Sequence, residues 1–258
     1  MSLLLVDAAR RLRLQVLLAA QLENWRDVWR AYRQRRRPPM LRFRNGRTLD
    51  HGPHDAPVFL FLEIFANRCY HRFMPRDLDG VVVDAGANIG AFTLACASWH
   101  PRVTIHAYEP NPAAREMLAR NVAANGLEAR VTIWPEALGA HDGSIQFHVA
   151  GASLEAGVLA SGESIEVPTV SLATVVGRAG GRVSLLKMDV EGAEADVFEA
   201  SRSRGVLCIV GEYHPEIAPR VVERLRAALD GDFAVRFSDT RRCGRTFAAT
   251  RRGAKERR

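Results

Sequence analysis

A glycine-containing turn near the middle of the chain carries residue types that bind nucleotide-like ligands. An apolar run at 81–83 leads into Asp84, Gly86, Asn88 and Gly90. Glycine adopts backbone angles closed to other residues and lets a ligand approach the main chain, while a helix that starts after the turn offers unpaired N–H groups to an anion. Glu109 comes 23 residues after Gly86, at the end of the next apolar run. A carboxylate there can accept both hydroxyls of a ribose, so the spacing predicts a nucleoside-containing ligand.

The turn departs from the fingerprint of dinucleotide-binding proteins. In a G-x-G-x-x-G motif that starts at Gly86, the second and third glycines would fall at Asn88 and Ala91. Their absence argues against a pyrophosphate pressed on the second glycine and favours a smaller anion, such as the carboxylate of a methionine moiety. An NAD-linked oxidoreductase stays open as an alternative. No P-loop, G-x-S-x-G or H-E-x-x-H motif occurs in the sequence.

Ionisable residues gather at the ends of two further apolar runs. Lys187 and Asp189 end the first run, where strand alternation puts both on one face, and Glu212 and His214 end the second. An imidazole is poised for proton transfer near neutral pH, so His214 is the first candidate for a general base and Asp189 the second, with Glu212 beside them. Lys187 is one of only two lysines, against 34 arginines. Lysine, unlike arginine, can be deprotonated when buried, which makes Lys187 a catalytic candidate, with a salt bridge as the alternative.

The same cluster also has the composition of a metal site. Asp189, Glu191, Glu212 and His214 offer hard oxygen ligands and one imidazole, which favours Mg²⁺ or Ca²⁺. The alternative is a set of hydrogen bonds that shapes the loops. A divalent metal therefore stays undecided at this point.

The elements that must position these residues follow an α/β pattern, in which short β-branched runs alternate with helical stretches from residue 81 onward. Strands are expected near 81–85, 103–108, 131–134, 183–189, 206–212, 233–237 and 246–250. Helices are expected near 90–98, 112–125, 193–204 and 215–229, with an inserted hairpin from 144–149 and 164–170. Nearly continuous apolar strands indicate a mostly parallel sheet covered on both faces, with ligands at the carboxyl ends of its strands.

The motifs in this order resemble the FkbM family of S-adenosylmethionine-dependent methyltransferases. The resemblance covers about residues 58–240 and rests on VVVDAGANIG at 81–90, AYEPNP at 107–112, KMDVEGAE at 187–194 and GEYHP at 211–215. It implies a seven-stranded Rossmann-like methyltransferase sheet with helices on both faces. The implied activity is transfer of a methyl group from S-adenosylmethionine to a small-molecule acceptor, a hydroxyl oxygen on a sugar or polyketide-like metabolite being favoured over nitrogen.

The resemblance also implies which residues bind the cofactor. The methionine end would lie over Asp84, Gly86, Asn88 and Gly90, and the ribose on Glu109. The adenine would lie near Glu136, Ala137 and Leu138, and the pocket would be closed from above by Glu63 and Tyr70.

The two ends of the chain are strongly basic, whereas the centre is acidic. Residues 1–49 carry twelve arginines against three acids, and residues 241–258 carry eight basic residues against one acid. We therefore expect a basic helical extension and hinge at 1–49, a methyltransferase domain at 50–240, and a last strand and basic tail at 241–258. One amphipathic helix is expected over 3–36, from the spacing of Leu14, Leu18, Leu22, Trp25, Trp29 and Tyr32.

The basic ends bear on the possible partners. The N-terminal helix is expected to pack on its own domain or on a second subunit, with membrane-surface contact through residues 1–37 as the alternative. Because the basic charge sits at the ends, nucleic-acid binding by the core is not expected. A non-catalytic protein that binds membranes or nucleic acid through its basic ends remains the alternative of another class.

The cysteines suggest a reducing compartment. Cys69, Cys96, Cys208 and Cys243 form no C-x-x-C pair, and we expect four buried thiols rather than a disulfide. Charged residues interrupt the N-terminal apolar run, and no small-residue cleavage site follows it. These features predict a cytoplasmic location.

Overall fold

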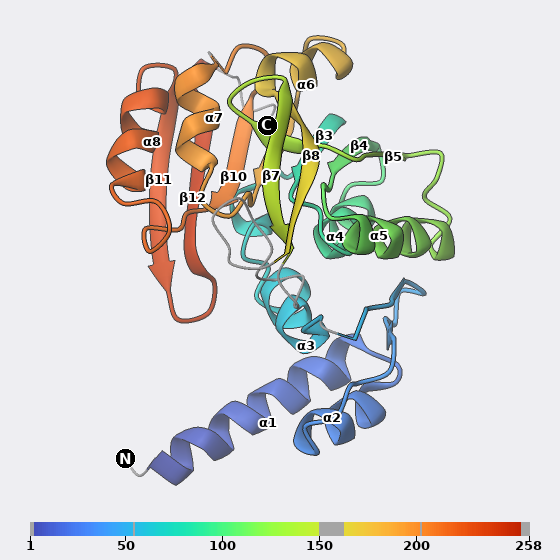
Figure 1. Cartoon of the computed structure of the whole chain (residues 1–258). Helices are drawn as coiled ribbons and strands as arrows, with labels where there is room; N and C mark the ends of the chain where they lie inside the picture. Colours follow the sequence, from blue (N-terminus) through green and yellow to red (C-terminus); the bar gives the residue numbers. More distant parts are fainter. Residues whose placement is uncertain (1–2, 54, 150–162, 202, 254–258) are drawn as a thin grey trace.

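The computed structural model describes residues 3–53, 55–149, 163–201 and 203–253, and its centre is a seven-stranded sheet (Figure 1). The strand order is β11-β12-β10-β9-β3-β4-β5, in which β12 runs antiparallel to both neighbours and the other contacts are parallel. The strands are β3 (Gly80–Ala85), β4 (Val103–Tyr108), β5 (Val131–Trp134), β9 (Leu185–Met188), β10 (Cys208–Glu212), β11 (Phe233–Thr240) and β12 (Gly244–Arg251). The predicted α/β class and the seven strands are confirmed.

Helices cover both faces of this sheet. Successive residues of a strand point to opposite faces, so Val82 of β3 belongs to one layer of the core and Val83 to the other. The first layer contains α4 (Ala91–Trp99) and α5 (Pro112–Ala124), and the second contains α6 (Leu172–Arg178), α7 (Glu194–Ala200) and α8 (Val221–Leu229). Helix α8 begins later than the expected residue 215, because residues 214–218 form turns and Arg220 is left-handed.

The expected single helix over 3–36 is two helices, α1 (Leu3–Gln21) and α2 (Trp25–Arg33). The break occurs at Asn24, whose side chain forms hydrogen bonds with the backbone of residues 40–42. Its Nδ2 donates to the Met40 carbonyl at 2.8 Å, and its Oδ1 accepts from the Arg42 amide at 3.1 Å. Periodicity could not show this break, because the partners lie 16 and 18 residues further along.

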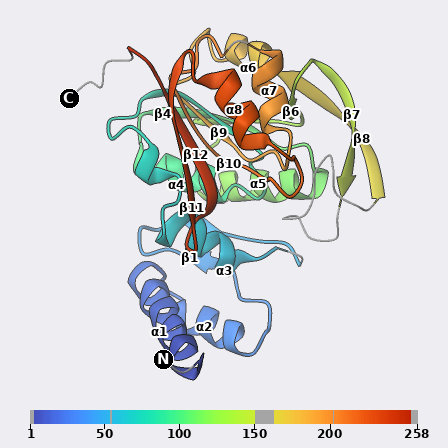
Figure 2. The same ribbon diagram turned by 90° about the vertical axis from the view of Figure 1, so that its left-hand side faces the viewer.

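The N-terminal helices pack on the rest of the chain, which agrees with the expectation that the amphipathic helix covers its own domain. Leu14, Leu18 and Leu22 are buried in the same core layer as α4 and α5. This layer also includes the short ribbon of β1 (Leu41–Arg42) and β2 (Thr48–Leu49). Figures 1 and 2 show α1 and α2 at the end of the molecule remote from α6. Among the described helices, none combines the length and apolar character that a membrane crossing requires.

The inserted hairpin is confirmed as part of a second, smaller sheet. β7 (Gly143–Val149) pairs antiparallel with β8 (Glu163–Ser171), and β6 (Ala137–Gly139) joins β8 in parallel. Figure 1 shows β7 and β8 in front of the main sheet. Phe147 of this sheet lines the main cavity described below.

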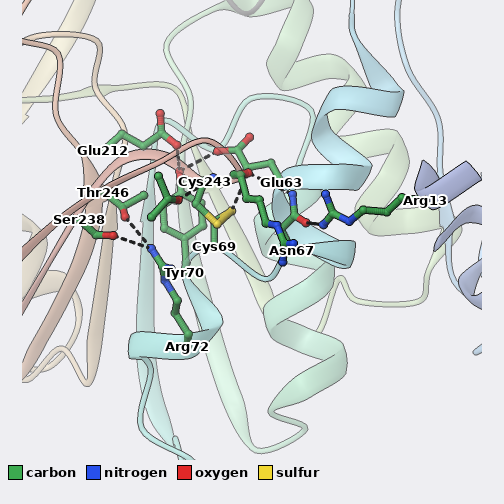
Figure 3. Close-up of a disulfide and its surroundings, with 12 residues drawn as sticks. Arg13, Glu63, Asn67, Cys69, Tyr70, Arg72, Glu212, Ser238, Cys243 and Thr246 are labelled. Atoms are coloured by element: carbon green, nitrogen blue, oxygen red, sulfur yellow. Dashed lines mark hydrogen bonds between the residues drawn. A yellow bond between two sulfur atoms is a disulfide. The ribbon is translucent and has the colours of Figure 1, made fainter. Parts of the chain in front are cut away.

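A segment of short helical turns lies between the N-terminal helices and β3, and a disulfide fastens it to the C-terminal hairpin. The turns are α3 (Pro57–Leu60), a π-helical turn (Phe61–Ala66) and a 3₁₀ turn (His71–Phe73). Cys69 is bonded to Cys243, 174 residues away, in the turn between β11 and β12 (Figure 3). The expectation of four thiols is therefore wrong. Cys96 and Cys208 are free and buried, as expected. The spacing of the cysteines in the sequence could not show that the β11–β12 hairpin brings Cys243 next to Cys69.

Candidate active site

The turn after β3 has the unusual backbone that its glycines predicted. Gly86, Asn88 and Gly90 have φ angles of 73°, 50° and 91°. A Cβ on Gly86 would lie 1.9 Å from the Asp189 carbonyl oxygen, and a Cβ on Gly90 would lie 2.6 Å from Leu118 Cδ1. Gly86 therefore lets the turn rest directly on the end of β9. Gly90 serves packing against α5 and does not line the cavity.

Glu109 closes the same turn from the end of β4. Its two carboxylate oxygens accept from the Asn88 amide at 2.7 Å and from the Asn111 amide at 2.8 Å. Burial raises the pKa of Glu109 to about 7, although both amides act in the opposite direction. The tips of the first two core strands thus meet at one place, as the sequence predicted.

Asp84 lies behind this turn. Its side chain is fully buried, its Oδ2 accepts from Thr93 Oγ1 at 2.6 Å, and its Oδ1 is 3.4 Å from Lys187 Nζ. It does not line the cavity, although it was predicted to bind the methionine end of the cofactor. Strand alternation turns this carboxylate toward Lys187, which itself lines the cavity.

A cavity of about 550 Å³ opens over the turn, within the usual range for small-molecule sites. Seven predicted cofactor residues line it, and so do all four predicted catalytic residues: Glu63, Tyr70, Gly86, Asn88, Glu109, Ala137, Leu138, Lys187, Asp189, Glu212 and His214. Two oxygens of this lining, Asn88 Oδ1 and Asp189 Oδ1, are buried and have no hydrogen-bond partner among the described residues. A ligand that carries N–H or O–H donors would satisfy them.

Glu136 is a predicted residue that the structure turns away from the cavity. Its two carboxylate oxygens accept hydrogen bonds from the two terminal nitrogens of Arg178, one of them at 2.9 Å. The guanidinium in turn lies 4.2 Å from the centre of the Trp134 ring. Glu136 is thus used in an ion pair outside the cavity lining, whereas its neighbours Ala137 and Leu138 line the cavity.

The roof of the cavity is a pair of partly buried acids, Glu63 and Glu212, beside the buried Tyr70. The Tyr70 hydroxyl donates to Glu212 at 3.0 Å and lies 3.5 Å from Glu63, as Figure 3 shows. Burial, reinforced by Asp189 and Glu63, raises the pKa of Glu212 to about 11, and burial also raises the pKa of Glu63. We infer that this pair holds at least one proton at neutral pH.

Lys187 is a buried cation that lines the cavity. Its Nζ donates to the Gly86 carbonyl at 2.8 Å and lies 3.4 Å from Asp84 and 3.7 Å from Asp189. Burial alone would lower the pKa of Lys187, but these carboxylates raise it to about 12. Lys187 therefore forms the salt bridges that were the alternative to a catalytic role. A neutral lysine acting as a base does not fit this arrangement.

His214 is held by an acid that sequence reasoning missed. The fully buried Glu194 lies 2.8 Å from His214 Nδ1, which directs Nε2 toward Glu191 at 3.6 Å and Glu212 at 3.9 Å. Burial lowers the pKa of His214, but Glu194 and the other acids raise it to about 9. The imidazole is therefore protonated at neutral pH, which disfavours the predicted role of His214 as the base. The only signal for Glu194 was its place at the end of the KMDVEGAE motif.

Three of the four expected metal ligands also converge, and Glu191 is not part of this group. Asp189, Glu212 and His214 each offer one donor atom, and these atoms lie within 4.8 Å of one another. A divalent cation could bridge them, and the same residues also take part in the hydrogen bonds and ion pairs described above.

Comparison with known proteins identifies the family. A family model described as the methyltransferase FkbM domain matches residues 84–242. The chain belongs to the FkbM methyltransferase family. The match includes the turn, Glu109, Lys187, Asp189 and His214, whereas the roof residues Glu63 and Tyr70 lie before it.

Relatives of this FkbM-family chain carry methyltransferase names. It is 34% identical over 194 residues to the 31-O-demethyl-FK506 methyltransferase FkbM of Streptomyces tacrolimicus, covering 61% of this chain and 74% of that protein. It is 32% identical over 199 residues to Methyltransferase 1 of Beauveria bassiana, covering 68% and 76%. A crystal structure of a methyltransferase FkbM from Methylobacillus flagellatus aligns with 95% of this chain and 60% of that one, at 12% identity and a TM-score of 0.48.

Proposed function

We propose that this FkbM-family chain uses S-adenosylmethionine to methylate a hydroxyl oxygen of a small hydroxylated metabolite. The observation that carries the proposal is that the glycine turn, Glu109, Asp189, Glu191 and His214 all line one cavity. Family membership favours methyl transfer over the NAD-linked alternative. The Streptomyces relative is named for 31-O-demethyl-FK506, which supports oxygen as the acceptor atom here.

The residues at the turn fit an adenosyl sulfonium compound. The oxygens of Glu109 already accept two amides, and each has a second lone pair for a ribose hydroxyl. Asn88 Oδ1 is buried without a partner and is suited to an ammonium donor. Pro110, Ala137 and Leu138 give the wall beside Glu109 an apolar surface for a purine. We assign the cofactor to these residues.

The chain's own task in the reaction is alignment and exclusion of water. When bound, S-adenosylmethionine supplies a methyl group already activated by its sulfonium. Phe59, Leu60 and Ile64 line the cavity with apolar side chains from the roof. Holding donor and acceptor in line within such an enclosure can contribute about 7–11 kcal/mol.

We assign proton removal to Glu191 in place of His214. Burial, reinforced by Asp189, raises the pKa of Glu191 to about 7, which suits a base at neutral pH. Its backbone is left-handed, with φ 51°, a strained conformation for a residue with a side chain. The protonated His214 lies 3.6 Å from Glu191 and stabilises its carboxylate.

Titration calorimetry with S-adenosylmethionine and S-adenosylhomocysteine tests the cofactor assignment. We expect one site per chain and thermal stabilisation by both compounds. No heat and no stabilisation at millimolar ligand would contradict the proposal. Incubation with radiolabelled donor and a panel of hydroxylated and amine-bearing metabolites then tests the acceptor class, and label found only on nitrogen would contradict the oxygen assignment.

Glu191→Gln tests the base once an acceptor is known. We expect kcat to fall by about 10²–10⁴, with little change in cofactor affinity, since the cofactor residues are untouched. In the unchanged protein kcat should rise with pH up to about 7, as Glu191 ionises. A larger loss in His214→Gln, without loss in Glu191→Gln, would return the base role to His214.

A further inference from the structure

A second cavity of about 490 Å³ lies on the outer side of the roof segment. Three parts of the chain that are distant in sequence form it: helix α1, the stretch around the π-helical and 3₁₀ turns, and the tip of the β11–β12 hairpin. Figure 3 labels Arg13, Asn67, Arg72 and Cys243 from these parts. The side chains that matter for its chemistry are Arg13, Asn67, Arg72, Thr240, Arg242 and Cys243.

The charge of this cavity is unbalanced. Three arginines line it, one from each of the three parts, and no acidic residue does. Arg13 donates to Asn67 Oδ1 at 2.6 Å, and Arg72 donates to Ser238 and Thr246 hydroxyls at 3.2 Å. Within the described part of the chain, the Arg242 side chain has no polar partner, and none of the three forms a salt bridge. Only neutral groups therefore bind these guanidinium groups.

The fold holds these like charges together. The disulfide between Cys69 and Cys243 fixes the hairpin tip against the roof segment. Asn67 joins all three parts, since its Oδ1 accepts from Arg13 and its Nδ2 donates to the Arg242 carbonyl at 3.1 Å. Like charges repel one another, so a hollow that gathers three of them favours an anionic ligand.

We propose that this cavity binds a phosphate group of a small molecule. Guanidinium groups present a planar fork of donors that matches phosphate oxygens, and charge-assisted bonds of this kind are the stronger ones. The three arginines line a hollow of small-molecule size. The occupant is therefore a compact anion, held by donors from three sides.

An anion here would be coupled to the active cavity through the roof. Asn67 and Arg72 flank Tyr70, which donates to Glu212 in that cavity. Bridging the three arginines would fix the segment that carries Tyr70. Binding can be measured without any methyl transfer, so this inference stands or falls separately from the proposed function.

Calorimetry with inorganic pyrophosphate on the full, oxidised chain is the direct test. The comparison is between Arg13→Ala/Arg242→Ala and the matched control Arg33→Ala/Arg236→Ala, which removes the same charge from exposed positions outside the cavity. At constant ionic strength we expect one site per chain, and an affinity at least about tenfold weaker in the cavity variant but within about twofold in the control. Melting curves of both variants confirm that each is folded.

Equal losses in the two double variants would overturn the proposal, because they would indicate attraction by net charge only. The absence of a binding heat at millimolar pyrophosphate would also overturn it. Phosphatidylglycerol vesicles distinguish a lipid headgroup from a soluble phosphate. If the cavity arginines are needed for binding to vesicles while pyrophosphate does not bind, the small-molecule assignment is wrong.

Discussion

The two ends of the main cavity are built in different ways. At the cofactor end, a strand, a turn and the next strand form a nearly continuous unit, in which Glu109 binds the Asn88 amide only 21 residues away. At the roof, Tyr70 reaches Glu212 across 142 residues, and Cys69 reaches Cys243 across 174. The cofactor end depends on local backbone conformation, whereas the roof depends on contacts between residues that are distant in the sequence. We therefore expect point changes to damage the two ends by different physical routes.

The sharpest test of the cofactor end is Gly86→Ala. The new Cβ would lie 1.9 Å from the Asp189 carbonyl oxygen, on a backbone with φ 73°. The backbone strain and the forced shift together should lower the free energy of unfolding by about 3–5 kcal/mol, measured by urea denaturation. Gly46→Ala is the matched control, since Gly46 has φ 81° and open space around its Cβ position.

The control should lose only about 1–2 kcal/mol, from the backbone conformation alone. Equal losses in the two variants would mean that the close approach of the turn to β9 does not matter. The difference between them measures the packing of the turn, separately from its left-handed conformation.

The roof is tested by removing its cross-link. Cys69→Ser/Cys243→Ser should lower the free energy of unfolding by about 2–5 kcal/mol, because the disulfide restricts a long loop of the unfolded chain. Cys96→Ser/Cys208→Ser is a control that changes two cysteines without removing a cross-link, though both lie in the core. If reducing agent leaves the melting temperature of the unchanged protein unaltered, the cross-link does not contribute to stability.

The contrast between the two ends also explains what the sequence could predict. The strands that carry the site, the turn and Glu109 follow from local apolar runs and glycines, and the structure places them as expected. The disulfide, the break at Asn24 and the hold of Glu194 on His214 depend on partners that come together only in the folded chain. Glu136 shows the limit most clearly, because its neighbours Ala137 and Leu138 line the cavity while its own side chain pairs with Arg178.

Glu109→Ala separates cofactor binding from stability at the turn. Two bonds from ribose hydroxyls to this carboxylate would be lost, and at about 1.5 kcal/mol each the affinity for S-adenosylmethionine should fall about a hundredfold. Glu136→Ala is the matched comparison, since its carboxylate lies outside the cavity. Calorimetry should show an affinity within about twofold of the unchanged protein for that variant. The reverse order of effects would place the ribose at Glu136.

The smallest expected effect is a pH dependence of cofactor affinity. Burial raises the pKa of Glu109 to about 7, so the ligand-free protein takes up a proton there as pH falls below 7. The ionised carboxylate is the better acceptor for ribose hydroxyls, and binding must then displace that proton. The affinity should therefore fall by up to about tenfold for each pH unit below 7. Calorimetry at pH 6 and pH 8 measures this change, which Glu109→Gln should abolish.

The raised pKa of Glu109 has the opposite effect on the pH dependence of stability in the ligand-free protein. Between pH 4.5 and about 7 the folded chain keeps a proton on Glu109 that the unfolded chain has released. The stability that this proton contributes is present below pH 4.5 and is lost as pH rises through 7. Cofactor affinity should thus improve over the pH interval in which Glu109 makes the empty protein less stable. If both quantities rose together through this interval, Glu109 would not be the group that links them.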